Sequence, residues 1–363
     1  MKAACFFGNG DIRVEELPEP TIEQPTDALV RVTLSSICGS DLHYFHAGEQ
    51  LGFPAGMRTG HEFLGTVEAV GSEVTDLRPG DRVLGHPLPV DGSCGYCRER
   101  TFPCAFGPGA FGFSPAFWPY GGDIQGGQSE MVRVPFAGGT LTPMPAAAAG
   151  AEHEHALLTC VDNLATGWHA AVTAGVTAGQ DVLVIGDGGV GLCAVVSAAL
   201  KGAEQVICLG HHDDRLAVAE RLGATALINS RDTDEIAARV LDLTGGAGAH
   251  AVLQTISGEE PMAISQACAR RCGVVSCVGM EQFVGRVPGV DWVDQWIRNI
   301  TITGGIVPGP HYTAELAGLV ADGRVDPSPI FTHTLPLEQA PEGYRMMAER
   351  ADGVIKVALT PGG

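Results

Sequence analysis

Charged residues are scarce in this chain, and basic residues are the scarcest. Only 18% of the 363 residues are charged, and 22 lysines and arginines stand against 42 aspartates and glutamates, for a formal net charge of −20. A surface of that sign repels phosphate backbones and anionic lipid headgroups. We therefore expect neither a nucleic acid nor a membrane as a partner.

Uninterrupted apolar runs are missing too. The most apolar stretch, residues 182–200, is broken by Asp187 and four glycines, which argues against a membrane span. The start of the chain, MKAACFFGNG, has no apolar run after a basic start, so we expect no secretory signal. The 11 cysteines are scattered rather than spaced as a disulfide framework, and several lie in apolar runs. A reducing, cytoplasmic location is the expectation.

The chain is longer than a single hydrophobic core usually serves, so two domains are expected. The first 150 residues or so are rich in glycine and proline and carry short β-branched runs at 28–34, 63–70, 81–84 and 131–134. This pattern is typical of an irregular, barrel-like β domain. Residues 145–155 break the rhythm and are interpreted as a boundary loop. After residue 303 the composition becomes mixed again, so residues 1–163 and 303–363 are expected to form one domain.

From about residue 164, apolar strands and helical segments alternate. Buried strands are expected at 181–185, 205–209, 226–228, 251–255 and 273–278, and helices at 190–201, 215–222, 233–243 and 261–269. The β-α alternation predicts a parallel, doubly wound sheet over residues 164–302.

A glycine-rich turn follows the first of these strands. Gly186, Gly188 and Gly191 have the G-x-G-x-x-G spacing, in which the first glycine permits the turn, the second admits a pyrophosphate and the third allows close packing. Free N–H groups at the helix start favour anions. We expect a dinucleotide to be bound by Gly186, Gly188, Gly189, Val190 and Gly191. A tight turn without ligand is the alternative.

The end of the second strand selects the cofactor. An acidic residue there would bind the ribose 2′-hydroxyl of NAD. This chain instead has small or basic residues at and after that point: Gly210, His211, His212 and Arg215. Imidazoles and a guanidinium favour a 2′-phosphate, so NADP is the predicted cofactor. NAD is the alternative, with Asp213 or Asp214 as the acid.

Three potential zinc ligands occur near the N-terminus: Cys38, His61 and Glu62. Each is ordinary by itself, since single cysteines and histidines are mostly structural. A catalytic zinc needs about three ligands drawn from Cys, His and carboxylate, with one position left open. In a chain with a dinucleotide turn, this set suggests a metal-assisted redox reaction.

Five motifs that occur in a fixed order along the chain resemble those of a known family. They are C-G-S-D-x-H at 38–43, G-H-E-x-x-G-x-V-x-x-V-G at 60–71, G-D-R-V at 80–83, D-x-x-x-T-G-x-H at 162–169, and the glycine turn. Together they resemble the zinc-dependent alcohol dehydrogenases of the medium-chain dehydrogenase/reductase family over essentially the whole length. The resemblance implies an α/β protein with a GroES-like β-barrel catalytic domain and a Rossmann cofactor domain. It also implies hydride transfer between NADP(H) or NAD(H) and a small alcohol, aldehyde or ketone.

The resemblance assigns the metal ligands position by position. Cys38 and His61 match the first two ligands of the catalytic zinc, and Asp162 falls at the third. Cys160, two residues earlier, is the alternative third ligand. Glu62 matches a residue that binds the metal in some states and stays behind it in others.

Proton transfer is assigned in the same way. Asp41 matches a carboxylate that holds a ligating imidazole in the correct tautomer. Ser40 matches the hydroxyl that takes the substrate proton, and His43 the relay towards solvent. Zinc helps the alcohol lose its proton while the hydride passes to the nicotinamide, so the ligands and the proton exit must lie together.

The chain departs from the family at a second, structural zinc. Relatives carry Cys-x2-Cys-x2-Cys-x7-Cys, whereas this chain has Cys94, Cys97 and Cys104 with Arg100 at the third position. A closed site needs four ligands, so the structural zinc is expected to be lost unless Asp91 replaces the missing cysteine. The segment that follows resembles a subgroup that includes formaldehyde-handling enzymes, which leaves aldehyde dismutation open.

Substrate and assembly are the last expectations from family position. Phe113, Trp118 and Trp168 would line an apolar pocket, although Trp118 could equally pack the lobe. Residues 298–305 would form an edge strand that pairs across a two-fold axis in a homodimer or homotetramer. Two rival functions remain: a reductase of C=N or C=C bonds on the same scaffold, and a non-catalytic cofactor-binding protein.

Overall fold

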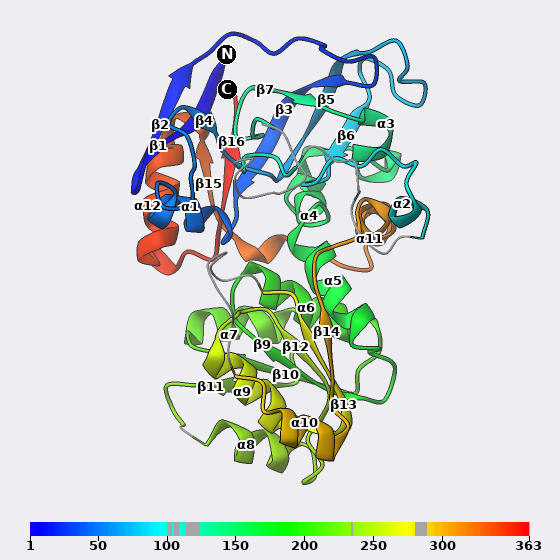
Figure 1. Cartoon of the computed structure of the whole chain (residues 1–363), viewed down its shortest axis with the longest axis vertical. Coiled ribbons are helices and arrows are strands. Elements are labelled where there is room, and N and C mark those ends of the chain that lie inside the picture. The colour runs from blue at the N-terminus through cyan, green and yellow to red at the C-terminus, as the bar shows by residue number, and fades with distance from the viewer. Residues whose placement is uncertain (100–103, 105–108, 114–123, 234, 280–288, 363) are drawn as a thin grey trace. The chain divides into compact units, whose positions relative to one another are not determined.

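The computed structural model describes residues 1–99, 104, 109–113, 124–233, 235–279 and 289–362 (Figure 1). The chain divides into two units, Met1–Asp162 with Val307–Gly363, and Asn163–Ile306. The boundaries expected from the sequence, at residues 163 and 303, lie within a few residues of these. The second one differs because the strand Thr301–Gly304 pairs with the sheet of the second unit, so the chain leaves that unit only after it.

The first unit is built mainly from β-strands, as expected. A seven-stranded sheet has the order β15-β16-β3-β5-β6-β8, with β7 paired to β3, and a three-stranded sheet has the order β2-β1-β4. The larger sheet consists of β3 (Ala28–Ile37), β5 (Phe63–Val70), β6 (Arg82–Gly85), β7 (Met131–Val134), β8 (Leu141–Pro143), β15 (Phe331–Pro336) and β16 (Lys356–Thr360). The smaller sheet consists of β1 (Lys2–Gly8), β2 (Asp11–Glu16) and β4 (Met57–Arg58).

Short helices connect these strands. They are α1 (Asp41–Ala47), α2 (Gly95–Glu99), α3 (Ala137–Thr140), α4 (Glu154–Thr159), α11 (His311–Ala321) and α12 (Ala340–Glu349). Single 3₁₀ turns lie at Ala146–Ala148, Ala151–His153, Ser328–Ile330, Leu337–Gln339 and Ala351–Gly353. The segment 145–155, interpreted as a boundary loop, contains two of these turns and the start of α4, and the first unit continues beyond it to Asp162.

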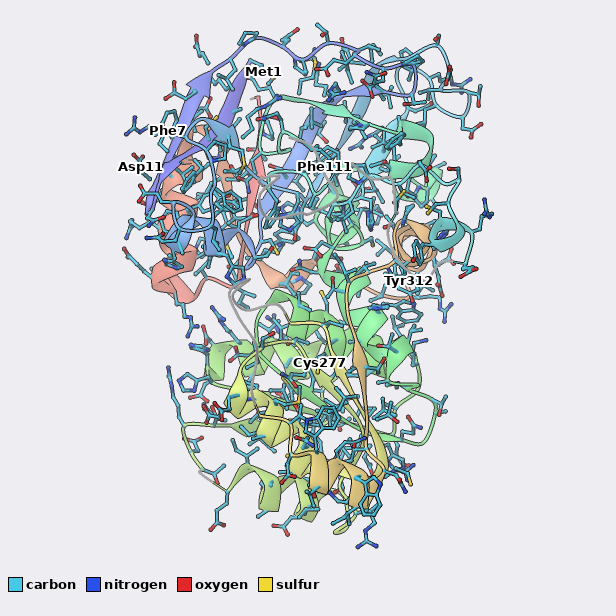
Figure 2. All side chains as sticks on the ribbon, in the orientation of Figure 1. Met1, Phe7, Asp11, Phe111, Cys277 and Tyr312 are labelled. Carbon is cyan, nitrogen blue, oxygen red and sulfur yellow. The ribbon has the colours of Figure 1, made fainter. Side chains whose placement is uncertain are left out.

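Close strand contacts form the core of this unit. Along the first part of β3, buried and partly exposed residues alternate, as expected for a strand with one face on the core. Gly65 in β5 lies opposite Val32, and a Cβ atom at Gly65 would stand 2.1 Å from the carbonyl oxygen of Arg31. Only glycine allows so close an approach. The rings of Phe63 and Phe111 (labelled in Figure 2) pack edge to face, with 5.2 Å between their centroids.

The C-terminal segment returns to the first unit and pairs with its central strand. β16 runs antiparallel to β3, with Val357 opposite Ile37 and Ala358 opposite Ser36. This register places Lys356 beside the end of β3, and Cys38 is the residue that follows that end. Residues far apart in the chain therefore meet at one end of the sheet.

The second unit contains a six-stranded sheet in which every pairing is parallel, with the order β11-β10-β9-β12-β13-β14. Its strands are β9 (Asp181–Ile185), β10 (Gln205–Gly210), β11 (Ala226–Asn229), β12 (Ala249–Gln254), β13 (Ala269–Cys277) and β14 (Thr301–Gly304). The chain order reverses between β9 and β12, as in a doubly wound dinucleotide-binding sheet. The predicted fold class is confirmed.

Helices accompany these strands. The four that the sequence predicted begin within three residues of their expected positions, and the first and last of the following were not predicted. They are α5 (Asn163–Thr173), α6 (Gly189–Leu200), α7 (Asp213–Arg221), α8 (Ile236–Leu243), α9 (Glu259–Cys268) and α10 (Trp292–Arg298). Most of α6 is buried, which explains its nearly unbroken apolar sequence. None of the helices in the described part of the chain is long and apolar enough to cross a membrane.

Candidate active site

Four potential metal ligands from distant segments meet in the first unit. Cys38 follows β3, His61 and Glu62 precede β5, and Asp162 ends the first segment of the unit. One donor atom from each lies within 4.8 Å of all the others. Asp162 Oδ2 is 3.4 Å from Cys38 Sγ and 3.2 Å from His61 Nε2. The structure thus brings the predicted set together. Donor atoms this close to one another can all surround one zinc ion at the usual zinc–ligand bond lengths of about 2.0–2.3 Å.

Burial concentrates negative charge in this cluster. Burial raises the pKa of the Cys38 thiol, and the carboxylates of Asp162 and Glu62 raise it further. Burial alone lowers the pKa of His61, but Asp41 and Asp162 hold it well above its ordinary value. The cluster therefore attracts positive charge, and a divalent cation would satisfy its thiol, imidazole and carboxylate donors together.

Lys356 is a member of this site that the sequence analysis missed. Its Nζ lies 2.6 Å from Glu62 Oε2, and both side chains are almost fully buried. The hydroxyl of Ser36 donates to the same carboxylate oxygen. Burial lowers the pKa of Lys356, but Glu62 and the neighbouring Cys38 keep it above the ordinary value. The signal in the sequence was a single lysine inside the apolar run V-I-K-V-A-L.

Asp41 lies directly behind His61. Its Oδ1 is 3.0 Å from His61 Nδ1, and its Oδ2 accepts the backbone N–H of Cys38 at 2.9 Å. The imidazole can therefore present Nε2 to the cluster. Ser40 Oγ lies 3.3 Å from that same Nε2, and His43 lies on α1 in a half-buried position.

Cys160 does not belong to the cluster. Its thiol donates to the carbonyl of Ala156 at 3.6 Å, and burial raises its pKa to about 12. The group of donors that lie within 4.8 Å of one another consists of Cys38, His61, Glu62 and Asp162 and does not include Cys160. Of the two candidates for the third ligand, Asp162 is the one that lies in the cluster.

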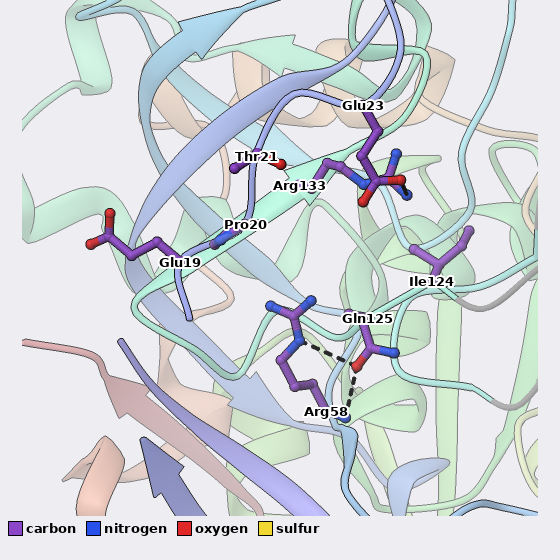
Figure 3. A pocket seen from close by; sticks show the side chains of 8 residues that line it. All are labelled: Glu19, Pro20, Thr21, Glu23, Arg58, Ile124, Gln125 and Arg133. Carbon is purple, nitrogen blue, oxygen red and sulfur yellow. Dashed lines mark hydrogen bonds and ion pairs between the residues drawn. The ribbon is translucent and has the colours of Figure 1, made fainter. Parts of the chain in front are cut away.

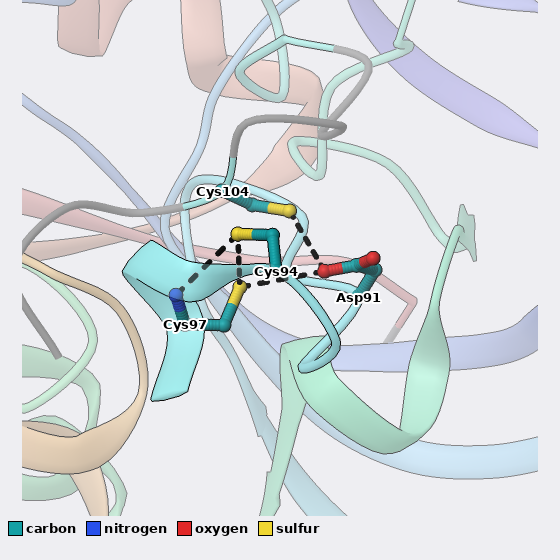
Figure 4. A group of neighbouring side chains, drawn as sticks. All are labelled: Asp91, Cys94, Cys97 and Cys104. Carbon is teal, nitrogen blue, oxygen red and sulfur yellow. Dashed lines mark hydrogen bonds between the residues drawn. The ribbon is translucent and has the colours of Figure 1, made fainter. Parts of the chain in front are cut away.

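A second cluster forms in the lobe after β6 (Figure 4). Asp91 Oδ1 accepts from Cys104 Sγ at 3.0 Å and from Cys97 Sγ at 3.4 Å, and Cys94 Sγ is 3.3 Å from Cys97 Sγ. The carboxylate of Asp91, which the sequence left open as a fourth donor, thus lies beside the thiols, because the turn before Cys94 brings it there. Arg100 lies outside the described residues.

The glycine turn in the second unit has the geometry that its spacing predicts. Gly186 has a φ of 121°, which strongly favours glycine, and a Cβ atom at Gly191 would stand 2.0 Å from the Gly186 carbonyl oxygen. A Cβ atom at Gly188 would meet nothing within 4 Å. The backbone before α6 is therefore open at the position where a pyrophosphate would approach, with Gly189 and Val190 in the first turn of the helix.

An acidic side chain unexpectedly faces the end of β10. Asp187, from the glycine turn itself, accepts the backbone N–H groups of His211 at 2.7 Å and His212 at 2.9 Å. It also accepts from His212 Nδ1 at 3.0 Å and lies 3.7 Å from the Arg215 guanidinium. Burial raises the pKa of Asp187, but these donors lower it overall. The spacing of Asp187 within G-D-G gave no hint of this role.

The remaining residues of the predicted cofactor site surround this carboxylate. Gly210 has to be small, since a Cβ atom there would stand 2.8 Å from Asp187 Cβ. His211 Nδ1 lies 2.9 Å from Ser230 Oγ. Asp213, one of the alternative acids, accepts from Asn229 Nδ2 at 2.6 Å.

The three aromatic candidates for the substrate pocket have different outcomes. The Phe113 ring lies 5.3 Å from the imidazole of His61, so it provides an apolar wall beside the cluster. Trp168 is buried in the second unit with the Lys201 ammonium 4.1 Å above its ring, a cation–π contact. Trp118 lies outside the described residues.

Comparisons with known proteins agree with these observations. Residues 24–146 match the alcohol dehydrogenase GroES-like domain, and residues 189–322 match the zinc-binding dehydrogenase domain. The chain is 32% identical over 391 aligned residues to an uncharacterized zinc-type alcohol dehydrogenase-like protein AdhB of Bacillus subtilis, covering 99% of this chain and 100% of that protein. It is 33% identical over 374 residues to an alcohol dehydrogenase of Cupriavidus necator, covering 99% of each.

Solved structures show the same relationship. The alcohol dehydrogenase TADH from Thermus sp. ATN1 superposes with a TM-score of 0.90 at 33% identity, over 100% of both chains. A zinc-binding dehydrogenase from Sinorhizobium meliloti 1021 bound to NADP superposes with a TM-score of 0.83 at 28% identity, over 99% of both. These similarities do not favour a reductase of C=N or C=C bonds. The chain belongs to the zinc-dependent alcohol dehydrogenases of the medium-chain dehydrogenase/reductase family and is an oxidoreductase that acts on alcohols.

Proposed function

We propose that Cys38, His61 and Asp162 bind a catalytic zinc, and that the chain interconverts a hydrophobic alcohol and its aldehyde or ketone. The observation that carries this proposal is the convergence of the three donors, with Glu62, within 4.8 Å. The bound zinc would supply a Lewis acid that stabilises negative charge on the substrate oxygen. Phe113, packed against His61, suits an apolar substrate.

The surrounding side chains have separate tasks in this proposal. Glu62 is held by Lys356 and by the hydroxyl of Ser36, so in this proposal three ligands bind the zinc and one coordination position is left for substrate. Asp41 fixes His61 through Nδ1. The Ser40 hydroxyl, next to His61 Nε2, takes the substrate proton, and His43 on α1 passes it on.

A matched pair of substitutions tests the ligand assignment. Asp162→Ala should remove the zinc of the catalytic site and lower kcat/KM by about 10³-fold or more, because a ligand is lost where charge develops. Cys160→Ala should keep the metal and most of the activity, since its thiol donates to the carbonyl of Ala156 and does not belong to the cluster. Zinc content per chain and turnover of a panel of alcohols are the measurements. Retention of zinc and activity in Asp162→Ala would overturn the assignment.

We propose NADP(H) as the preferred cofactor. Two imidazoles and the Arg215 guanidinium gather at the end of β10, where a 2′-phosphate would need positive charge. Asp187 is engaged by backbone and side-chain donors of that loop, which limits its use as an acceptor for a ribose hydroxyl. The NADP-bound relative from Sinorhizobium meliloti supports the same choice.

Replacing both His211 and His212 with alanine tests the cofactor preference. The loss of charge-assisted contacts should weaken NADPH binding by about ten- to a hundredfold and leave NADH binding nearly unchanged. Dissociation constants are measured by fluorescence titration of each reduced cofactor. An intact chain that binds NADH more tightly than NADPH would contradict the proposal and favour the NAD alternative.

We further propose a second zinc in the lobe, held by Asp91, Cys94, Cys97 and Cys104. Four donors within 4.8 Å form the closed set that a structural zinc requires. Burial raises the pKa of the Asp91 carboxyl, yet hydrogen bonds from Cys104 and Ser93 lower it to about 2. Burial and the neighbouring Cys94 and Cys104 raise the pKa of Cys97 to about 12. Without a cation the thiols stay protonated, so binding would release protons.

Metal counting distinguishes one zinc from two. We expect two zinc ions per chain, falling to one in Cys97→Ser with a lower unfolding temperature, because a structural zinc stabilises the fold that binds it. Cys272→Ser, at an exposed cysteine, is the control and should keep both. A single zinc in the unaltered chain would refute the second site.

We propose that two copies of the chain associate through α10 and β14. Trp292 and Trp296 are 71% and 77% exposed, and Val293 and Ile297 on the same short helix are also exposed. No other described strand pairs with the outer edge of β14. A bare edge next to exposed tryptophans favours a two-fold pairing that covers both.

Light scattering tests this assembly. Trp296→Asp should shift the chain towards the monomer, because it places a charge at the centre of the apolar surface. Leu227→Asp on β11, at the opposite edge of the sheet, should leave the assembly intact. A mass unaffected by Trp296→Asp would exclude this surface.

A further inference from the structure

The side-chain amide of Gln128 is the centre of a buried hydrogen-bond network behind the metal cluster. Its Nε2 donates to the Ser36 carbonyl at 2.9 Å and to Asp41 Oδ2 at 3.3 Å. Its Oε1 accepts from Thr59 Oγ1 at 2.6 Å and from the Tyr344 hydroxyl at 2.8 Å. An amide offers two donors and two acceptor positions, so this one is fully used.

Asp41 connects the amide to the metal cluster. Its carboxylate takes hydrogen bonds from the Gln128 amide and the Cys38 backbone on one oxygen and faces His61 Nδ1 at 3.0 Å with the other. Gln128 and Asp41 are both completely buried, so water cannot easily replace a lost partner. The orientation of the amide therefore sets the plane of the carboxylate, and the carboxylate sets the imidazole.

The hydrogen bonds of the network share one direction. The hydroxyl groups of Tyr44 and Tyr344 lie 2.6 Å apart. Since Tyr344 donates to Gln128, Tyr44 must donate to Tyr344. Burial raises the pKa of both phenols, and the Asp41 carboxylate raises them further, so they stay protonated donors. The chain of donors runs from Tyr44 through Tyr344 and Gln128 to the Asp41 anion, where successive bonds strengthen one another.

A glycine beside the ligand makes room for this amide. Gly60 precedes His61 and has a φ of 87°, and a Cβ atom there would stand 2.3 Å from Gln128 Cγ. Gly126 approaches the same segment, with its Cβ position 2.0 Å from the Thr59 carbonyl oxygen. The glycine of the G-H-E motif therefore admits Gln128 to the space behind the ligand.

We propose that Gln128 is a positioning residue of the catalytic centre: through Asp41 it fixes the His61 imidazole and so sets the affinity for the metal. Tyr344, by donating to Oε1, fixes which end of the amide faces Asp41. The inference rests on the proposed function, in which His61 is a zinc ligand. It assigns a role to a residue that touches neither metal nor substrate.

Gln125 offers a matched control on the same segment. Its Oε1 accepts from the backbone N–H of Arg58 at 3.1 Å and from Arg58 Nε at 3.2 Å. It lines a polar pocket of about 360 Å³ together with Glu19, Glu23 and Arg133 (Figure 3). The same change from an amide to a thioether can thus be made at Gln128, inside the hydrogen-bond network, and at Gln125, outside it.

The test is zinc retention against increasing chelator, read as zinc per chain in Gln128→Met, Tyr344→Phe and Gln125→Met. Gln128→Met should lose the zinc required for hydride transfer at about ten- to a hundredfold lower chelator concentration. Zinc in the lobe should be released at the same chelator concentration as in the unaltered chain. Tyr344→Phe should also lower the chelator concentration at which the catalytic zinc is lost, but by less. Gln125→Met should lose it at the same concentration as the unaltered chain. Cobalt substituted at the catalytic site should show an altered absorption spectrum in Gln128→Met.

Two results would overturn the inference. One is a Gln128→Met chain that keeps its catalytic zinc as firmly as the unaltered chain does. The other is a Gln128→Met chain whose zinc-free form is less stable to urea while zinc retention and cobalt spectrum are unchanged, which would make the amide purely structural. Failure of the proposed function looks different, because the unaltered chain would then hold no zinc at Cys38, His61 and Asp162.

Discussion

The burial of several acidic groups in one small volume is the constraint on which the first unit depends. Asp41 and Glu62 are almost fully buried, and Asp162 and the Cys38 thiol lie beside them. In an interior of low dielectric, each unpaired charge is strongly destabilising. These charges are compensated by Lys356 beside Glu62, by His61 between Asp41 and Asp162, and by the Cys38 backbone N–H and the Gln128 amide at Asp41. The donors that remain are those suited to a metal ion.

The ends of three strands place these charged residues next to one another. β3 ends just before Cys38 and β5 begins shortly after His61, the first two proposed ligands. β16 pairs with β3 so that its first residue, Lys356, is the compensating cation. Small residues permit this crowding, since a methyl group at Gly60 would collide with the Gln128 side chain and one at Gly65 with the Arg31 backbone. Catalysis needs ligands held within a fraction of an ångström, and strands hold them better than mobile loops.

Much of this could be read from the sequence, and the exceptions share one physical cause. Cys38, His61, Asp162 and the glycine turn lie in motifs whose spacing carries the geometry, and the β-α alternation predicted the parallel sheet. Lys356 and the role of Asp187 were missed, and Asp91 could be named only as a possible fourth donor, because the partners of all three are fixed by tertiary contacts. The register of β16 against β3 decides that Lys356 faces Glu62, and one turn decides that Asp91 meets the thiols. Gln128 is further removed, since its four partners come from four separate segments.

The pairing of β16 with β3 also bears on how the protein matures. During synthesis, the segments with Cys38, His61 and Glu62 leave the ribosome long before residue 356 has been translated. Until that residue arrives, Glu62 has no ammonium partner, and β3 lacks a neighbour along the side that β16 will cover. Charge compensation of the buried Glu62 carboxylate is thus completed only when the returning strand closes the sheet.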